Sequence, residues 1–409
     1  PKGFACPHCG KSAGFTKEED TLDGWFDSGS THFAAMKKDQ GFWPATMYLE
    51  GLDQYRGWFQ SSLLTAVGAF GEGAPFKECV THGWTVDGEG RAMHKSLGNG
   101  VDPADIFNEN GADILRLWAA SADYHADVRC SKAIFQQLSQ NYLKFRNTCK
   151  FMLDNLVDFD PAHLTKAEDM PVLDRWLITK LNELIEKVEQ SYNDYEFHII
   201  THAVNDFCVT TLSSFYLDIV KDRLYCEAAD SAERRSAQTA LYLTLSTLAK
   251  LFAPILAFTC DEIWLAMPHT AEDDARNVVL NDMNKPFTAY ALDAETMARW
   301  EHIIEVRTAV NGALEEARAA KVIGKSLEAD VHLTVPEGDV FLADENPAAL
   351  ADLFIVSKVE LTVGGELAVK VENAAGTKCP RCWKHSLTPN AEGLCPRCAE
   401  VVRHLPDLL

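Results

Sequence analysis

The chain has 409 residues and a formal net charge of −22, with 47% hydrophobic and 24% charged residues. This composition is typical of a globular chain of about two to four domains, and it excludes a disordered one. The negative net charge excludes a protein that binds nucleic acid through a positive potential over its whole surface, although local basic surfaces stay possible. The longest apolar stretch, residues 241–257, contains Lys250 and Pro254, so we expect core helices and no membrane span.

The first residues predict half of a metal site. Cys6 and Cys9 form a Cys-x-x-Cys pair with His8 as a weaker third ligand, so the remaining ligands would come from other sequence. The alternative is a turn with two free thiols. Because the chain starts at Pro1 rather than Met, we expect that it is truncated.

Residues 1 to about 125 predict a parallel α/β unit. Segments 46–50 and 78–81 have the composition of short buried strands, and residues 61–70 between them have that of an apolar helix. Ligands of parallel sheets gather at the carboxyl ends of the strands, where residues 50–54 and 81–84 follow.

The loop at residues 90–99 is a candidate phosphate site. It contains Lys95 and Ser96, which can hold phosphate oxygens, and small residues that let the backbone approach a ligand. A solvated glycine-containing loop is the alternative, and the string alone does not decide between them.

From about residue 130 the pattern predicts a helical bundle. Apolar residues recur at steps of three and four from residue 138 to 152, after Pro171, from 207 to 220 and from 241 to 251. Residues 270–298 are expected to connect the bundle to another helix at 300–320. Alternation at 331–335 and 368–372 predicts strands, and hence a small α/β piece.

Four cysteines near the end of the chain predict a structural zinc site. Cys379 and Cys382 form one Cys-x-x-Cys pair, and Cys395 and Cys398 form another, with twelve residues between the pairs. Four thiolates suit one tetrahedral zinc ion without an open position, and Lys378, Arg381 and Arg397 would offset their charge. Two disulfides or free thiols are the alternatives. Without a secretion signal the cysteine pairs favour metal binding and a reducing cytoplasm.

Arg381 and Trp383 beside the first pair are a candidate RNA contact. An exposed Trp next to an Arg can stack on an unpaired base while the guanidinium meets a phosphate. The alternative is a Trp that covers the small core of the module.

Several segments, in this order, resemble the second half of the class I isoleucyl-tRNA synthetases. They are Asp20-Thr-Leu-Asp-Gly-Trp-Phe-Asp-Ser-Gly29, Tyr48-Leu-Glu-Gly-Leu-Asp-Gln-Tyr-Arg-Gly-Trp-Phe59, Met93-His-Lys-Ser-Leu-Gly-Asn99 and Cys379-Pro-Arg-Cys-Trp383. The resemblance covers essentially the whole chain. It implies half of a Rossmann-type catalytic α/β domain, an α-helical anticodon-binding bundle and a zinc-ribbon-like module.

The resemblance also implies roles for individual residues. Residues 92–96 take the place of the family's Lys-Met-Ser-Lys-Ser loop, in which Lys95 would stabilise charge on ATP phosphates and departing pyrophosphate. Ala92 and His94 depart from that motif, and Arg91 is a possible substitute for the missing lysine. The remaining implied contacts are Ser96, His82 and Gly83 for ATP, Glu50, Gly51, Asp53 and Gln54 for the aminoacyl-adenylate, Trp25 and Trp58 for the isoleucine pocket, and Arg381 and Trp383 for tRNA.

The implied protein is an isoleucine–tRNA ligase whose substrates are isoleucine, ATP with Mg²⁺ and tRNA(Ile). The family's His-Ile-Gly-His sequence and its editing domain do not occur in residues 1–409, so the chain alone is expected to be inactive and to need its missing N-terminal part. We expect a half catalytic domain at 1–128, the anticodon-binding helices at 129–290, an α/β junction at 299–373 and the zinc module at 376–409. The alternatives are a non-catalytic tRNA-binding module and a valyl- or leucyl-type synthetase.

Overall fold

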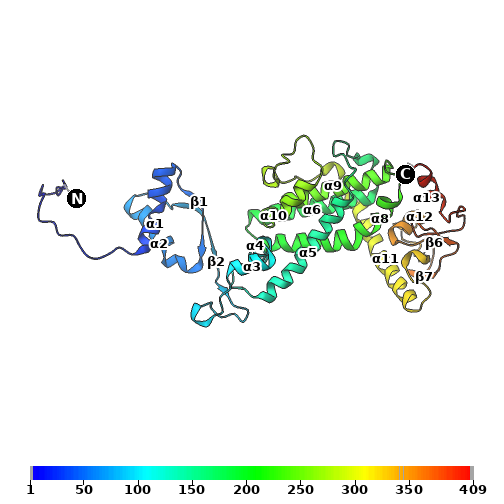
Figure 1. Ribbon diagram of the computed structural model, residues 1–409, viewed down its shortest axis with the longest axis horizontal. Helices are drawn as coiled ribbons and strands as arrows, with labels where there is room; N and C mark the ends of the chain where they lie inside the picture. Colours follow the sequence, from blue (N-terminus) through cyan, green and yellow to red (C-terminus); the bar gives the residue numbers. More distant parts are fainter. Residues whose placement is uncertain (1–2, 340, 344, 406–409) are drawn as a thin grey trace. The chain divides into compact units, whose positions relative to one another are not determined.

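The computed structural model describes residues 3–339, 341–343 and 345–405 (Figure 1). It consists of two compact units, one formed by residues 1–100 with 123–131 and the other by residues 101–122 with 132–409. Residues 101–122 therefore group with the helices, whereas we expected them in the α/β domain. The four domain boundaries themselves stay a prediction, and their outermost residues, 1–2 and 406–409, lie outside the described part of the chain.

The first unit contains a parallel strand pair with a helix between its strands, as predicted. Strand β1 pairs with β2 so that Glu50 lies opposite Thr81 and Gly51 opposite His82. The predicted helix begins earlier, at Trp58, and its second half is π-helical. The elements of this unit are α1 (Gly24–Gly29), β1 (Ala45–Gly51), α2 (Trp58–Leu64), a π-helical stretch (Thr65–Ala69), β2 (Phe76–His82), β3 (Thr85–Val86) and β4 (Val128–Arg129).

The prediction that both strands are buried was wrong for β2. In β2 only Phe76 and Val80 are partly buried, whereas the other side chains are exposed. The physical reason is that a strand is buried on both faces only where other elements cover both faces of its sheet. Within the described residues β2 pairs with β1 alone. The small core lies on one side, around Tyr48 and Phe59.

The second unit is built on long helices, as the periodicity predicted. Helices α5, α6 and α9 match three predicted helices, and the fourth runs through α7, a π-helical stretch and α8 without a break. Figure 1 shows α5, α6, α8 and α9 side by side. The helices are α3 (Pro103–Asn110), α4 (Ala112–Ser121), α5 (Lys132–Asp154), α6 (Val172–Asn193), α7 (Phe197–Asp206), the π-helical stretch (Phe207–Tyr216), α8 (Leu217–Cys226), α9 (Ala232–Phe252) and α10 (Ala257–Ala266).

A small α/β piece follows the bundle, and both predicted strands are confirmed. Its three-stranded sheet has the order β6-β5-β7, with β6 parallel and β7 antiparallel to β5. Alternate residues of β5 are buried, because one face of the sheet packs on the core of the unit. The elements are α11 (Ala294–Ala319), β5 (Ala329–Val335), α12 (Pro347–Phe354), β6 (Lys358–Val363), β7 (Ala368–Asn373), β8 (Thr377–Lys378), β9 (His385–Ser386) and α13 (Pro396–Arg403).

No helix in the described part of the chain is long and apolar enough to cross a membrane. The apolar run at residues 241–257 instead forms the second half of α9 and the turn after it, and it is buried in the bundle on nearly all sides. Its apolar character is therefore explained by helix packing.

Candidate functional site

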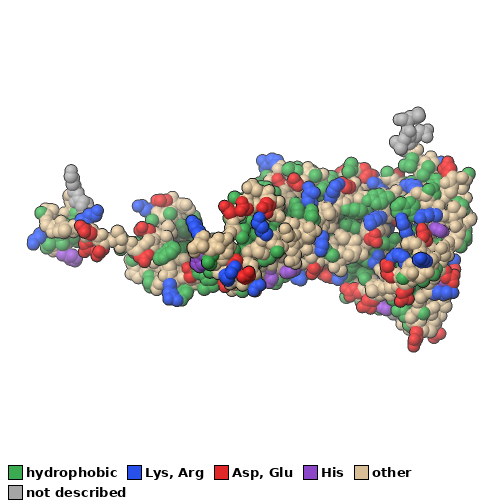
Figure 2. All heavy atoms as spheres, turned by 60° about the horizontal axis from the view of Figure 1, so that its bottom comes forward, with side chains coloured by type: hydrophobic (Ala, Val, Ile, Leu, Met, Phe, Trp, Pro, Cys, Tyr) green, Lys and Arg blue, Asp and Glu red, His purple; other side chains and the backbone are tan. Residues whose placement is uncertain are grey.

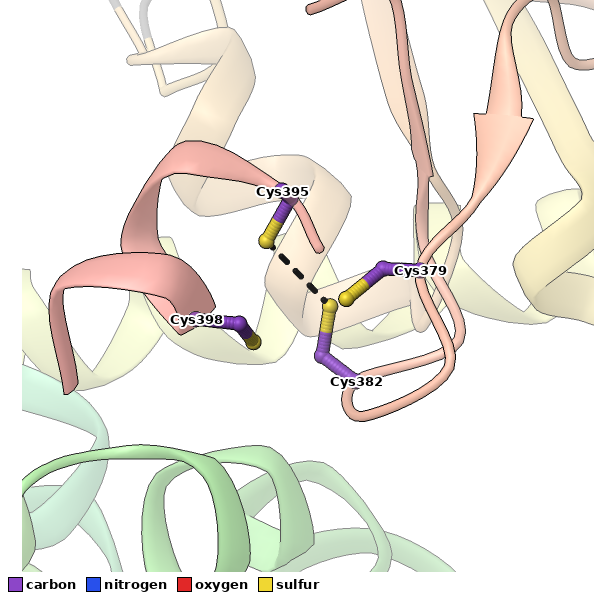
Figure 3. A group of neighbouring side chains, drawn as sticks. All are labelled: Cys379, Cys382, Cys395 and Cys398. Carbon is purple, nitrogen blue, oxygen red and sulfur yellow. Dashed lines mark hydrogen bonds between the residues drawn. The ribbon is translucent and has the colours of Figure 1, made fainter. Parts of the chain in front are cut away.

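The four C-terminal cysteines converge on one point (Figure 3). Cys379 and Cys382 lie on the turn between β8 and β9, and Cys395 and Cys398 lie at the start of α13. Their Sγ atoms all lie within 4.8 Å of one another, and those of Cys382 and Cys395 are 3.7 Å apart. Two turns separated by twelve residues thus present four sulfur ligands to a shared centre.

This geometry fits a zinc ion. A tetrahedral zinc with bonds of about 2.3 Å to sulfur requires S–S separations of about 3.8 Å, close to the distance observed between Cys382 and Cys395. All four cysteines are free, which removes the alternative of two disulfides. Because Cys379, Cys382 and Cys398 are buried, the site has the closed character of a structural rather than a catalytic metal centre.

Backbone amides prepare the site for a metal ion. Burial by itself would raise the pKa of the Cys379 thiol. The backbone N–H groups of Cys382, Cys395 and Arg381 have the opposite and larger effect, so the resulting pKa is lowered to about 6. In contrast, burial and the neighbouring thiolates raise the pKa of Cys382. Backbone N–H groups therefore favour the thiolate form of Cys379, whereas a metal cation would favour that of Cys382.

Two arginines of the module anchor it to the C-terminal end of α8. Arg381 donates to the backbone oxygens of Tyr225 and Cys226, and its Nη1 lies 3.7 Å from Cys398 Sγ. Arg397 donates to the carboxylates of Asp222 and Glu227. We expected these arginines to offset the thiolate charge, and Arg381 does so, but both also neutralise the negative end of a helix.

Trp383 is exposed, as its predicted role in RNA binding requires. Its side chain is 53% exposed, and the ammonium of Lys325 lies 5.4 Å from the ring centroid. The turn holds it in the left-handed region at a φ of 65°, because its N–H donates to the oxygen of Cys379 and closes the knuckle. Trp383 is therefore not the cover of the small core, whose buried residues are Cys226, Leu394 and three of the cysteines.

The turn at Cys6 has the same backbone hydrogen bonds as the knuckle at Cys379. Cys6 N donates to Lys11 O at 2.8 Å, and Gly10 N donates to Cys6 O at 2.8 Å. In the C-terminal knuckle the equivalent bonds run from Cys379 N to Lys384 O and from Trp383 N to Cys379 O, each at 2.9 Å. Backbone N–H groups of Cys9 and His8 also lower the pKa of Cys6. The pair therefore has the backbone geometry of half a metal site.

Asp87 and Asn99 hold the loop that contains Lys95. Asp87 accepts from the N–H groups of Glu89 and Arg91, from Arg91 Nε and from Asn99 Nδ2. These bonds, with that of Asn99 first, lower the pKa of Asp87 well below its usual range. Sequence reasoning missed both residues, although an Asp before a glycine turn often binds the following backbone in this way.

Lys95 and Ser96 lie exposed on a short 3₁₀ turn of the same loop. Within the described residues the Lys95 ammonium has no hydrogen-bond or ion-pair partner, so its charge is available to a ligand. Arg91, by contrast, is paired with Asp87 and Glu89. The residue that we considered a substitute for the missing lysine is therefore already engaged within the loop.

The predicted adenylate contacts meet at the carboxyl ends of β1 and β2. A Cβ on Gly51 would lie 2.8 Å from Asp53 Oδ1 and 3.8 Å from His82 Cε1, so the side chains of Asp53 and His82 both lie next to Gly51. Glu50 lies beside Gly51 and accepts from its N–H at 3.2 Å. Gln54 faces the next turn, where its Oε1 accepts from the N–H of Trp58 at 3.3 Å.

Gly83 allows a close approach of two backbone segments. A Cβ there would lie 2.4 Å from the oxygen of Ala126, and Gly83 N donates to Tyr124 O. This packing brings residues 123–131 alongside β3, where Thr85 pairs with Val128. The assignment of Gly83 to ATP stays a prediction, and what the structure shows is that Gly83 is needed for packing.

The two predicted pocket tryptophans lie on neighbouring helices. Trp25 is 47% exposed on α1, whereas Trp58 packs beside Tyr48 at the start of α2 with ring centroids 4.8 Å apart. The helices touch at Gly29, where a Cβ would lie 2.5 Å from Ser61 Cβ. Within the described residues no hydrogen bond or aromatic contact joins these tryptophans to the Lys95 loop, so their assignment to one site stays a prediction.

Charges of both signs lie on the face of the molecule that Figure 2 shows. Figure 2 shows Lys and Arg side chains interspersed with Asp and Glu on the face in view, rather than gathered into one basic surface. This agrees with the net charge of −22 and means that an RNA contact would depend on local groups such as Trp383.

Comparison with known proteins gives two family matches. Residues 8–131 match the tRNA synthetases of class I (I, L, M and V), and residues 174–333 match the anticodon-binding domain of tRNA ligase. A solved structure titled as the ternary complex of Agrobacterium radiobacter K84 agnB2 LeuRS with tRNA and LeuAMS aligns with a TM-score of 0.56 at 16% identity. The alignment covers 91% of this chain and 38% of that one. This likeness shows the fold alone.

Curated relatives match the chain along nearly its whole length. The isoleucine–tRNA ligase of Moorella thermoacetica is 47% identical over 431 aligned residues, covering 99% of this chain and 45% of the relative. The isoleucine–tRNA ligase of Desulforamulus reducens is 48% identical over 426 aligned residues, which cover 98% of this chain and 45% of the relative. The chain thus spans less than half the length of the curated relatives it matches.

Proposed function

We propose that this chain, which carries class I tRNA synthetase domains and is homologous to isoleucine–tRNA ligases over almost its whole length, works as part of such a ligase. The reaction is the ATP-dependent activation of isoleucine to its adenylate and transfer to tRNA(Ile). The observation that carries the proposal is an identity of 45–48% to relatives that all have this name, over 98–100% of the chain. A valyl- or leucyl-type enzyme is less well supported.

The first unit would hold the adenylate and the phosphates. Lys95, unpaired and exposed, would stabilise the charge that builds on pyrophosphate as the isoleucine carboxylate attacks the α-phosphorus of ATP. Ser96 would accompany it at the phosphates, which enter with Mg²⁺. The groups at the ends of β1 and β2, from Glu50 to Gln54 with His82 and Gly83, would hold the adenylate, and Trp25 and Trp58 would enclose the isoleucine side chain.

The second unit would bind tRNA, and the zinc module would support that contact. The four cysteines would hold one structural zinc ion, which would fix the knuckle rather than take part in the reaction. Trp383 would stack on an unpaired base. Since Arg381 already donates to α8, an RNA contact would use its remaining N–H groups. Cys6 and Cys9 would be half of a second metal site, completed by ligands from outside this chain.

The chain alone is expected to show no isoleucine-dependent exchange of pyrophosphate into ATP. Residues 1–409 contain no His-Ile-Gly-His sequence, and the family active site needs it opposite the Lys95 loop. The measurement is the exchange assay with the chain alone and with the chain joined to the preceding half of a relative. Exchange by the joined protein should require isoleucine rather than valine or leucine. Robust exchange by the chain alone would contradict a divided active site.

Substitution of Trp383→Ala is expected to weaken tRNA(Ile) binding. Loss of one base stack costs about 1–3 kcal/mol, which is roughly a fivefold to hundredfold rise in Kd. Filter binding or fluorescence anisotropy with tRNA(Ile) would measure it. Trp84→Ala is the matched control, because Trp84 is 55% exposed but lies in the first unit.

The pyrophosphate exchange assay separates the ligase from a non-catalytic tRNA-binding module. The alternative is favoured by the match to an anticodon-binding domain at residues 174–333. Both functions predict tRNA binding, but only the ligase predicts exchange activity in the joined protein. If Trp383→Ala and Trp84→Ala bound tRNA equally well, the proposed role of the knuckle would be wrong.

A further inference from the structure

A cavity of about 450 Å³ lies within the second unit, between α6, α8, α11 and α12. None of the residues assigned above to ATP, isoleucine, zinc or tRNA lines it. Its walls combine basic and apolar side chains, of which the argument uses Leu173, Ile219, Arg223, Arg299, Trp300 and Leu353. The volume is in the range of small-molecule sites.

Arg299 brings an unsatisfied donor to this cavity. Its Nη2 donates to Glu345 Oε1 at 2.6 Å, but its Nε is buried without any hydrogen-bond partner. A buried donor without a partner costs about 1–3 kcal/mol, more when it carries charge. A guanidinium is suited to hold an oxyanion through two parallel N–H groups, so the Arg299 side chain in the lining is a candidate anion contact.

Arg223 adds a second guanidinium to the lining of the cavity. Its Nη1 donates to Asp174, but that carboxylate is also satisfied by Tyr216 and Ser236. Within the described residues no carboxylate engages the other N–H groups of Arg223. The guanidinium therefore has donors left for a ligand.

The acids and apolar groups around the cavity define the rest of the ligand. Both carboxylates in the lining are occupied, Glu345 by Arg299 and Asp352 by Lys384. The N-terminus of α6, which carries no side-chain cap, adds the positive end of a 22-residue helix. Leu173, Ile219, Leu353 and Trp300 give the cavity an apolar wall. An anionic group on an apolar or aromatic body would satisfy both kinds of surface.

We propose that this cavity binds a small molecule that carries a carboxylate or a phosphate on an aromatic body. The anion would be held between Arg299 and Arg223, and the ring would pack against Trp300. This site is independent of the proposed ligase function, because none of its lining residues belongs to the Lys95 loop or to the zinc knuckle and it belongs to the second unit alone.

The test follows the indole signal of Trp300 in the ¹⁵N spectrum of the whole chain, assigned with Trp300→Phe. The probes are phenyl phosphate and benzoate, which show whether the cavity binds a phosphate or a carboxylate. Benzyl alcohol is the uncharged aromatic control. We expect a saturable shift with at least one anion and none with the alcohol at the same concentration. Arg299→Met should raise the Kd about tenfold, which equals about 1.4 kcal/mol.

Two further variants keep the test decisive. Ala349→Trp, on the exposed rim of the cavity, leaves both arginines in place and should abolish the shift by filling the space. Lys95→Ala should bind the probes like the unchanged chain, which separates this site from the nucleotide loop. The proposal is overturned if neither anion gives a saturable shift, if benzyl alcohol binds equally well, or if both Arg299→Met and Ala349→Trp bind the anions unchanged.

Discussion

Removal of zinc is expected to unfold residues 377–404 and to leave the helical bundle folded. The module has almost no core of its own, because its buried residues are three of the four cysteines and Leu394, packed against Cys226 of α8. So few residues cannot bury enough apolar surface to fold without a bound metal ion or a cross-link. Binding of a structural zinc ion is worth about 10–16 kcal/mol in small zinc domains at pH 7, so a zinc ion bound here would supply the stability of this module.

Loss of the metal would also release the arginines that anchor the module. Arg381 and Arg397 reach Tyr225, Cys226, Asp222 and Glu227 only from the folded knuckle and the start of α13. We therefore expect the end of α8 to lose protection together with the module, whereas α5, α6 and α9 keep theirs. Trp383 would lose its position as well, so tRNA binding should fall with chelation.

Hydrogen exchange before and after chelation would measure this, with the metal content determined in parallel. The chain should hold about one zinc ion, and Cys379→Ser should remove it. Cys79→Ser is the control, because Cys79 is an exposed cysteine on β2 outside the cluster. In the joined protein, a second ion that disappears with Cys6→Ser would support the second site. Protection of residues 377–404 that survives removal of the metal would contradict the prediction.

Substitution of Asp174→Ala is expected to destabilise the bundle by about 3–5 kcal/mol. Asp174 on α6 is fully buried and accepts from Tyr216 Oη at 2.8 Å, Ser236 Oγ at 2.5 Å and Arg223 Nη1 at 3.2 Å. Its removal would leave two buried hydroxyl groups without an acceptor and a guanidinium without its counter-charge. Breaking one partner of a buried pair costs far more than the pair contributes, because the other charge stays behind.

The measurement is the free energy of unfolding from urea denaturation at pH 7, followed by the helical circular dichroism signal. Asp174→Asn should cost less than Asp174→Ala, because its amide oxygen still accepts and because burial already raises the pKa of Asp174 and disfavours its charged form. Asp154→Ala is the surface control. Asp154 forms an exposed pair with Lys150 on α5, so its loss should cost no more than about 0.5 kcal/mol. Equal losses for Asp174→Ala and Asp154→Ala would refute the argument.

The sequence alone predicted the parallel strand pair, the long helices and the metal cysteines, because each depends on a local pattern. Helices α5, α6 and α9 follow from apolar residues at steps of three and four, which specify one buried face wherever the helix lies. The cysteine pairs follow from a spacing that one turn of chain can satisfy. The four sulfur atoms come together when the two turns lie side by side, and a zinc ion would favour this arrangement because it prefers four tetrahedral ligands.

Other features could not be predicted, because they depend on residues far apart in the chain. Nothing near Asp174 in the sequence indicates that it is buried, since its partners lie on α8, on α9 and in the π-helical stretch. The placement of residues 101–122 with the helices likewise depends on contacts such as that of Arg116 with the backbone of Pro254. The prediction that β2 is buried was wrong for the same reason, because the burial of a strand depends on the elements that cover it and not on its own sequence.

The sequence by itself thus determined the long helices, the strand pair, the four cysteines that could hold a metal ion and the family that the order of motifs resembles. Only the tertiary structure decided that Arg381 is anchored to the end of α8, that Asp87 and Asn99 hold the Lys95 loop, and that two arginines face a cavity. The physical reason is that periodicity and ligand spacing act within a few residues of chain. Desolvation and hydrogen-bond partners, in contrast, are fixed only when distant segments pack together.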